Sequence, residues 1–376
     1  MHLTIVLTTL NAGGMERAAV NMANHWAARG WRPTILTTSQ RGRPLAYALD
    51  PGVIHRDIGW RRDPEDHELE PETVQAILRA IDSDRPEYDV LLGDVVLLIL
   101  LRRAIVATRP EVVISLADIM NVRMLAATQG LRFRRYVSER CDPERTHLKP
   151  EWELLRRRLY PHANGVIAQT ESAARYFERH GAKARAIANP VVPAPPANGT
   201  QKEARSIVAV ARLVAFKRLN VIIRAFASLE ARHPEWRLDI WGEGPLRDYL
   251  AGLIAEIGAE RITLRGHARD VYSAFRAADL FAMSSITEGF PNALCEAMAA
   301  GLPAVVYDCG AGVREIVRDG VDGVLVREDG PHAFALALER LMTDDEERQR
   351  LAARAPEIAS RYSVEAVMRQ WEEYIG

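Results

Sequence analysis

The chain has 376 residues, 48% of them hydrophobic and 26% charged, and a formal net charge of -1. This length is sufficient for two domains with separate cores, and the near-neutral charge provides no overall attraction to nucleic acid. Three widely spaced cysteines are too few for a disulfide framework or a Cys-rich zinc site, and they favour a reducing compartment.

The N-terminal residues predict a β-strand and lack the basic start and cleavage site of a secretory signal peptide. The longest apolar run, Val95 to Leu101, is much shorter than the roughly 20 residues that a membrane-spanning helix needs. We therefore expect a cytoplasmic protein.

The first half of the chain predicts strands and helices of an α/β domain. A helix with a small, apolar face is expected at Met15–Arg29, and the Pro-, Gly- and Asp-rich residues 41–72 are expected to form loops. Apolar, β-branched runs predict strands at Leu3–Thr9, Thr34–Thr38, Val112–Leu116, Tyr136–Ser138 and Gly165–Gln169.

A proline-rich segment separates the two halves. It begins at Asn189, holds four prolines and shows no helical pattern, which is typical of a semi-rigid linker. A C-terminal helix over residues 361–376 is expected to pack back on the first domain. We therefore predict three parts: a first domain over 1–190, a linker over 191–204 and a second domain over 205–360.

In the second half, short apolar runs alternate regularly with stretches of helical period. Predicted strands are Ser206–Ala211, Arg237–Trp241, Arg261–Arg265, Leu280–Met283, Ala304–Tyr307 and Gly323–Val326. Predicted helices are Leu219–His233, Leu246–Ile257, Val271–Ala278, Asn292–Ala300 and Val313–Val317. Six strands joined by helical crossovers favour a parallel, doubly wound sheet.

Two glutamates flank the start of the helix that follows the predicted strand Leu280–Met283. Glu288 precedes the helix and Glu296 lies one turn inside it. Ligands of open α/β sheets bind at the carboxyl ends of the strands, and the first N–H groups of this helix can cradle a phosphate. Ionised carboxylates accept hydrogen bonds from sugar hydroxyls. The alternative is a surface pair of glutamates around an ordinary helix start.

Two further segments follow strand ends. Arg212 and Lys217 come just after the first strand of the second half and can clamp a diphosphate; the alternative is a surface pair at a helix start. Gly13 and Gly14 follow the first strand of the chain and permit close backbone approach, or simply a tight turn. No G-x-G-x-x-G fingerprint follows any predicted strand, which disfavours a nicotinamide dehydrogenase.

Metal ligands are not evident in the sequence. Asp82 and Asp84 form a D-x-D, but no convincing strand precedes them, so we interpret them as a helix end. No cluster of His, Cys or Asp has zinc spacing. We expect an activity that needs no metal.

These motifs resemble those of glycosyltransferase family four, the large retaining GT-B family. The similarity covers nearly the whole chain. Within the family, the chain most resembles the branch that builds bacterial polysaccharides and lipid-linked oligosaccharides. The segments that carry it are the Gly13-Gly14 loop, Val137–Arg140, Asn189-Pro190, Ala211–Lys217, Gly242–Pro245, Arg265–Ala268, Glu288–Glu296 and Asp308–Glu315. The usual glycine before the family's Arg-Leu is replaced by Ala211.

The resemblance implies an α/β fold of GT-B type, with two Rossmann-like domains facing each other across a cleft. It implies catalytic roles for Arg212, Lys217 and Glu288. Donor-binding residues carried over from the motifs are Gly13, Gly14, Gly242, Glu243, Gly266, His267, Ala268, Gly289, Phe290, Pro291, Asn292, Ala293 and Glu296. The candidate acceptor residues are Asp118, Asn121, Glu139 and Arg140.

The implied reaction is retaining transfer of a hexose or N-acetylhexosamine from a nucleotide sugar. Arg212 and Lys217 would stabilise the charge on the departing diphosphate, Glu288 would orient sugar hydroxyls and Glu296 the ribose. The branch favours a UDP-linked donor, with GDP-mannose as the alternative. There are two competing interpretations. One is a GT-B epimerase or phosphorylase, and the other is a partner subunit that only binds nucleotide.

Charge is unevenly placed along the chain. Residues 101–190 carry 17 Lys and Arg against 9 Asp and Glu, and apolar residues accompany the arginines in Leu97–Arg103, Leu131–Tyr136 and Leu154–Tyr160. One hypothesis is that this part of the chain rests on the anionic inner face of the membrane and takes a polyprenyl-diphosphate-linked or other saccharide acceptor. The alternative is an arginine-rich surface that contacts only water.

Overall fold

The computed structural model describes residues 1–60, 71–80, 88–196, 205–268, 270–327 and 329–376. Within these residues, no helix is long and apolar enough to cross a membrane. The chain forms two compact units. Unit 1 comprises Met1–Ala188 with Val367–Gly376, and unit 2 comprises Asn189–Ala366. Each unit has its own sheet and its own buried apolar core.

Unit 1 is built on a parallel sheet of seven strands in the order β3-β2-β1-β4-β5-β6-β7. The strands are β1 (His2–Leu7), β2 (Arg32–Thr37), β3 (Ile54–Asp57), β4 (Val112–Leu116), β5 (Arg134–Ser138), β6 (Gly165–Ala168) and β7 (Ala184–Ala186). The central strands are buried on both faces, which explains why they are mostly apolar.

The helices of unit 1 cover the two faces of this sheet. They are α1 (Gly14–Ala28), α2 (Pro71–Ala80), α3 (Asp89–Leu92), α4 (Val95–Ala107), α5 (Asp118–Ala127), α6 (Pro150–Leu159), the 3-10 turn η3 (Tyr160–His162) and α7 (Glu171–Arg179). The last helix of the chain, α16 (Val364–Ile375), returns to this unit. There the buried Trp371 packs edge-on against Trp26 of α1, with ring centroids 6.2 Å apart.

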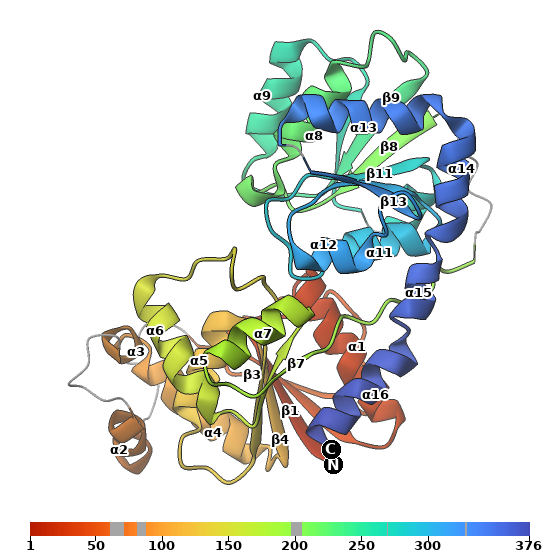
Figure 1. Cartoon of the computed structure of the whole chain (residues 1–376). Helices are drawn as coiled ribbons and strands as arrows, with labels where there is room; N and C mark the ends of the chain where they lie inside the picture. Colours follow the sequence, from red (N-terminus) through yellow and green to blue (C-terminus); the bar gives the residue numbers. More distant parts are fainter. Residues whose placement is uncertain (61–70, 81–87, 197–204, 269, 328) are drawn as a thin grey trace. The chain divides into compact units, whose positions relative to one another are not determined.

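Unit 2 has a parallel sheet of six strands in the order β10-β9-β8-β11-β12-β13. The strands are β8 (Arg205–Val210), β9 (Trp236–Trp241), β10 (Ile262–Gly266), β11 (Leu280–Met283), β12 (Ala304–Tyr307) and β13 (Gly323–Val326). The helical elements are η4 (Ala215–Lys217), α8 (Leu219–Ala227), α9 (Arg247–Ile257), α10 (Val271–Arg276), α11 (Asn292–Ala299), α12 (Ala311–Ile316), α13 (Pro331–Thr343), α14 (Asp345–Arg354) and α15 (Glu357–Arg361). Figure 1 shows α8 and α13 on one face of this sheet and α11 and α12 on the other.

The predicted pair of parallel, doubly wound α/β domains is confirmed. Each sheet contains one point where the strand order reverses, between β1 and β4 in unit 1 and between β8 and β11 in unit 2. Ligands of such sheets bind at the carboxyl ends of the strands beside this point. The strands β3 and β7 were not predicted, because both are short edge strands whose residues are not buried apolar ones.

Candidate functional site

The strongest candidate site lies in unit 2, at the carboxyl ends of β8 and β11. Lys217 ends the turn η4, and Glu288 lies in the loop between β11 and α11. The Lys217 Nζ and the Glu288 Oε1 are 2.5 Å apart, and both side chains are more than four-fifths buried. Arg212, two residues beyond β8, is exposed to solvent. The structure therefore brings together two of the three residues predicted to be catalytic.

Backbone contacts hold Lys217 in place. The Ser284 hydroxyl, just beyond β11, donates to the carbonyl oxygens of Lys217 and Arg218 at 3.0 and 2.8 Å. Arg218 starts α8 in the left-handed conformation, with φ of 47°, and its guanidinium lies 2.7 Å from Asp329. Sequence reasoning missed Ser284 and Arg218, although Ser284 follows a predicted strand end directly.

The Gly242–Pro245 loop supports the segment that carries Arg212. A Cβ added at Gly242 would lie 1.8 Å from the Ala211 carbonyl oxygen, and one at Gly244 would lie 2.5 Å from that of Leu213. The Leu213 N–H donates to the Glu243 carbonyl oxygen at 2.9 Å. Glycine is thus required sterically at both positions. The Glu243 side chain is exposed.

The segment from Gly289 to Ala293 forms the start of α11. Pro291 is the N-cap residue, directly before Asn292, and its ring has no acceptor that could make a capping hydrogen bond to the first N–H groups of the helix. Phe290 is 5% exposed and packs edge-on against Tyr362, with centroids 5.1 Å apart. Glu296 lies one turn further along α11.

The remaining donor-side residues follow β10. Gly266 ends this strand with φ of 77°, a conformation that favours glycine, and its carbonyl oxygen accepts from the Gly242 N–H at 2.7 Å. His267 is exposed and Ala268 is half-buried. The loop beyond β10 therefore lies next to the Gly242–Pro245 loop, as the motifs require.

In unit 1, Gly13 and Gly14 lie at the start of α1, beyond β1. The Tyr47 hydroxyl accepts from the Gly13 N–H at 3.2 Å and donates to its carbonyl oxygen at 3.1 Å. A Cβ at Gly13 would lie 2.2 Å from the Glu16 carboxylate. The glycine pair thus forms a tight turn that is anchored to the loop beyond β2.

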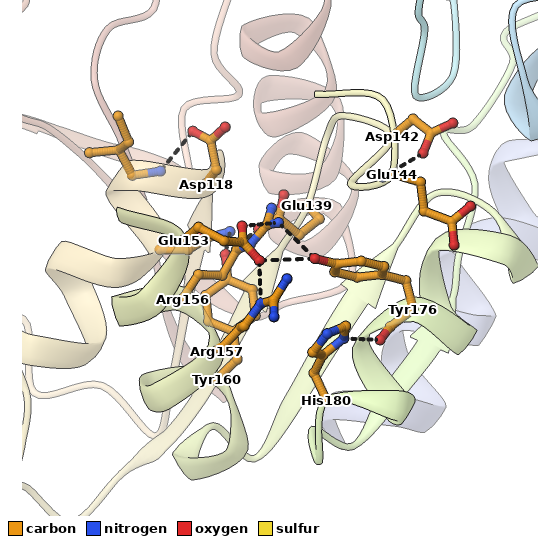
Figure 2. A network of polar contacts seen from close by, with 12 residues as sticks. Asp118, Glu139, Asp142, Glu144, Glu153, Arg156, Arg157, Tyr160, Tyr176 and His180 are labelled. Carbon is orange, nitrogen blue, oxygen red and sulfur yellow. Dashed lines mark hydrogen bonds and ion pairs between the residues drawn. The ribbon is translucent and has the colours of Figure 1, made fainter. Parts of the chain in front are cut away.

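The four candidate acceptor residues lie at the carboxyl ends of β4 and β5, where Figure 2 shows two of them, Asp118 and Glu139, within a polar network. Asn121 and Glu139 are almost completely buried, at 0% and 1% exposure. The Asn121 amide accepts from Ser115 at 2.7 Å and donates to the Ser138 carbonyl oxygen and the Tyr160 hydroxyl. This burial favours a supporting role for Asn121 and Glu139 over direct contact with a substrate.

Burial determines the ionisation of this network. The pKa of Glu139 is raised from its ordinary value of 4.5 to about 7, chiefly by burial, while Arg156 and the Tyr160 hydroxyl oppose the shift. Burial also lowers the pKa of Arg140 to about 10. Asp118 is less buried and starts α5 directly after Ala117, whose φ of 78° is strained for a residue with a side chain.

Arg156 corrects one expectation. The sequence suggested that the arginines of residues 154–160 lie on an exposed edge, but Arg156 is 3% exposed and its guanidinium lies 2.5 Å from Glu153 and over the rings of Tyr176 and Phe177. Glu153 also accepts from Arg157 and Tyr176 (Figure 2). Successive residues of a helix are about 100° apart around its axis, so three neighbouring arginines do not share one face, which composition alone does not show.

Within the described residues, no group of three or more His, Cys, Asp and Glu side chains could hold a metal ion. Asp82 and Asp84 lie outside the described residues.

Comparison with known proteins agrees with the fold and the site. Residues 194–358 match the family model for group 1 glycosyl transferases, and residues 13–194 match the glycosyl transferase 4-like domain. Together the two models cover most of the chain. The chain therefore belongs to the group 1 glycosyltransferases and is an enzyme of the GT-B fold, as the motifs predicted.

Three similar proteins illustrate this relationship. An exopolysaccharide phosphotransferase of Streptomyces coelicolor is 29% identical over 99% of this chain, but the chain spans only 40% of that protein. A Campylobacter jejuni α-1,4-N-acetyl-D-galactosaminyltransferase, named for its diNAcBac-PP-undecaprenol-linked acceptor, is 24% identical, and the match covers 100% of this chain and 98% of the relative. The crystal structure of a TarM variant of S. aureus, in complex with fondaparinux, α-GlcNAc-glycerol and UDP, superposes with a TM-score of 0.80 at 14% identity over the whole of both chains.

Proposed function

We propose that the protein transfers a hexose or N-acetylhexosamine, with retention, from a UDP-linked sugar to a saccharide or polyprenyl-diphosphate-linked acceptor. The Lys217–Glu288 pair at the start of α11 is the observation that carries this proposal. The UDP complex of the S. aureus structure supports the donor class. The lipid-linked acceptor in the name of the Campylobacter relative supports the acceptor class.

The site residues supply complementary interactions with a nucleotide sugar. Arg212 and Lys217 neutralise the diphosphate, on which charge builds as the glycosidic bond breaks, together with the first N–H groups of α11. Glu288 then accepts hydrogen bonds from hydroxyls of the sugar, and Glu296 from the ribose. No metal is needed, because the positive charge comes from the protein.

A panel of nucleotides and nucleotide sugars tests the donor assignment. Because a ligand that binds only the folded state stabilises it, UDP and one UDP-sugar are expected to raise the melting temperature more than GDP or GDP-mannose, with and without EDTA. Product analysis by NMR then separates the alternatives. An epimerised nucleotide sugar, a sugar phosphate, or binding without any turnover would each refute sugar transfer, and activity abolished by EDTA and restored by Mg²⁺ would refute the role of Arg212 and Lys217.

Gly312 tests whether the packing around α11 positions Glu288. A Cβ at this position of α12 would lie 2.0 Å from the Gly289 carbonyl oxygen, so Gly312→Ala is expected to displace this loop and lower turnover, with a stability loss of about 1–3 kcal/mol. The control is Gly252→Ala in α9, where a Cβ meets nothing within 4 Å. That variant is expected to be active and more stable by about 0.5–1 kcal/mol. Normal turnover in Gly312→Ala would show that this contact does not position Glu288.

We further propose that unit 1 contacts anionic lipid through the outward face of α6. Leu154 is 53% exposed there, and Arg157 lies one turn further on, with Arg158 beside it. Each basic residue near an anionic surface contributes about 1 kcal/mol of attraction. This face can bring the enzyme to a lipid-linked acceptor.

Vesicle co-sedimentation tests this contact. Binding to anionic vesicles is expected to fall as salt rises, and to weaken about tenfold or more when Arg157 and Arg158 are both changed to Gln. The matched control changes Arg350 and Arg354 of α14, which are similarly exposed and paired with glutamates, and should bind normally. Equal binding to neutral and anionic vesicles at low salt would leave a non-lipid acceptor as the better assignment.

A further inference from the structure

The chain passes between the two units twice, and the first passage is attached to the start of α11. Unit 2 begins at Asn189, which is 4% exposed. The Asn189 Nδ2 donates to the Oδ1 of Asn292, the first residue of α11, at 2.7 Å. The first residues of the linker are therefore part of the structure around the candidate donor site.

The second passage is attached to the same region. Tyr362, a few residues before the chain leaves unit 2, packs its ring on Phe290, and its carbonyl oxygen accepts from the Val191 N–H at 2.8 Å. The Tyr362 hydroxyl donates to the Glu315 carbonyl oxygen at 3.0 Å, and Arg361 donates to that of Ile316 at 2.8 Å. Both connecting segments are thus fixed to each other and to the loops at α11 and α12.

We propose that Asn189 is a positioning residue of the donor site and acts through Asn292. Because Asn189 donates to the Oδ1 of Asn292, that hydrogen bond sets the orientation of the Asn292 amide, and its NH2 group is directed away from the linker. An NH2 group beside the first N–H groups of α11 presents a further donor to an anion. The inference rests on the proposed function, because the anion in question is the diphosphate of the donor.

Two substitutions at this position separate orientation from simple loss of a contact. Asn189→Ala removes the hydrogen bond, and we expect UDP affinity to fall about threefold to tenfold, as for one hydrogen bond. Asn189→Asp keeps the shape but can only accept, so the Asn292 amide must turn its NH2 group toward the linker and its oxygen toward the diphosphate. We therefore expect Asn189→Asp to weaken UDP binding more than Asn189→Ala does.

Isothermal titration of the full chain with UDP tests the proposal, with Asn292→Ala combined with each Asn189 variant. If Asn189 acts through Asn292, both Asn189 substitutions have little further effect once Asn292 is alanine. If Asn189 has a merely structural role, or if the new charge acts directly, the loss of UDP affinity would persist when Asn292 is alanine. The matched control is Arg276→Gln, which removes another hydrogen bond to the linker, at Pro195, that does not involve Asn292, and should bind UDP normally.

The outcomes separate this inference from the proposed function. If the unaltered chain does not bind UDP or another nucleoside diphosphate, the proposed function fails. If it binds UDP and Asn189→Ala binds equally well, or if the effects of Asn189→Ala and Asn292→Ala simply add, the positioning role is refuted. A loss in Arg276→Gln as large as that in Asn189→Ala would also refute it. Thermal unfolding of each variant confirms that it is folded. If Asn189→Asp does not fold, the double-mutant cycle of Asn189→Ala and Asn292→Ala is the deciding test.

Discussion

Glu288→Gln is expected to lower turnover about 30- to 1000-fold, which corresponds to about 2–4 kcal/mol of lost transition-state stabilisation. The substitution keeps the size of the side chain but removes the charge that accepts from sugar hydroxyls and pairs with Lys217 at 2.5 Å. UDP carries no transferred sugar, so its affinity should change by no more than about threefold. Steady-state kinetics and UDP titration on the same preparation measure the two effects.

The control for this variant is Glu256→Gln, which neutralises an exposed glutamate of α9 in the same unit. It should have normal kinetics. Near-normal turnover in Glu288→Gln would remove Glu288 from the reacting site, whereas an equal loss of UDP affinity and turnover would assign it to nucleotide binding instead.

Glu139→Gln is expected to change how the stability of the protein depends on pH. Burial raises the pKa of Glu139 to about 7, so in the folded state this carboxyl keeps its proton at a pH where the unfolded chain, with a pKa of 4.5, has lost it. The folded state therefore binds more protons, and stability falls as the pH rises from about 4.5 to about 7. At about 1.4 kcal/mol per pKa unit, the loss is at most roughly 3.5 kcal/mol.

Gln cannot ionise, so Glu139→Gln should lack this decline between pH 5 and 7.5. Chemical denaturation at several pH values measures the difference, and Glu178→Gln, on the exposed face of α7, is the control that should follow the unaltered chain. The titratable groups around Glu139 are Arg156, Tyr160 and Asp118, and all three remain in the variant. Parallel pH profiles for Glu139→Gln and the unaltered chain would show that Glu139 ionises normally.

Hydrophobic periodicity predicted the strands that form the centre of each sheet, because these strands are buried on both faces and are mostly apolar. It did not predict β3 or β7, since an edge strand such as Ala184–Ala186 needs no apolar run and is held by pairing with its neighbour. The strand order likewise depends on contacts between distant residues. The alternation of strands and helices predicted a parallel, doubly wound sheet but not the order of its strands.

The candidate site was predictable where its residues lie close in sequence and less so elsewhere. Glu288 and Glu296 belong to one short motif, but Lys217 reaches Glu288 across 71 positions of sequence. The burial of Asn121 and Glu139 depends on Tyr160, which comes from another part of the chain, so the motifs that suggested both as acceptor residues could not show it. Ser284 acts through a hydroxyl bonded to main-chain carbonyls, an interaction that leaves no charge pattern in the sequence.

The return of residues Val367–Gly376 to unit 1 has a consequence for synthesis of the protein. All of unit 2 is translated before the segment that completes unit 1, including Trp371, which packs on Trp26, and Tyr374, whose hydroxyl donates to the Lys183 carbonyl oxygen. Unit 2 is contiguous in the chain and can fold as soon as it leaves the ribosome. The first unit to emerge is thus the last to be finished, and until residues 367–376 are made the surface on which α16 packs stays uncovered.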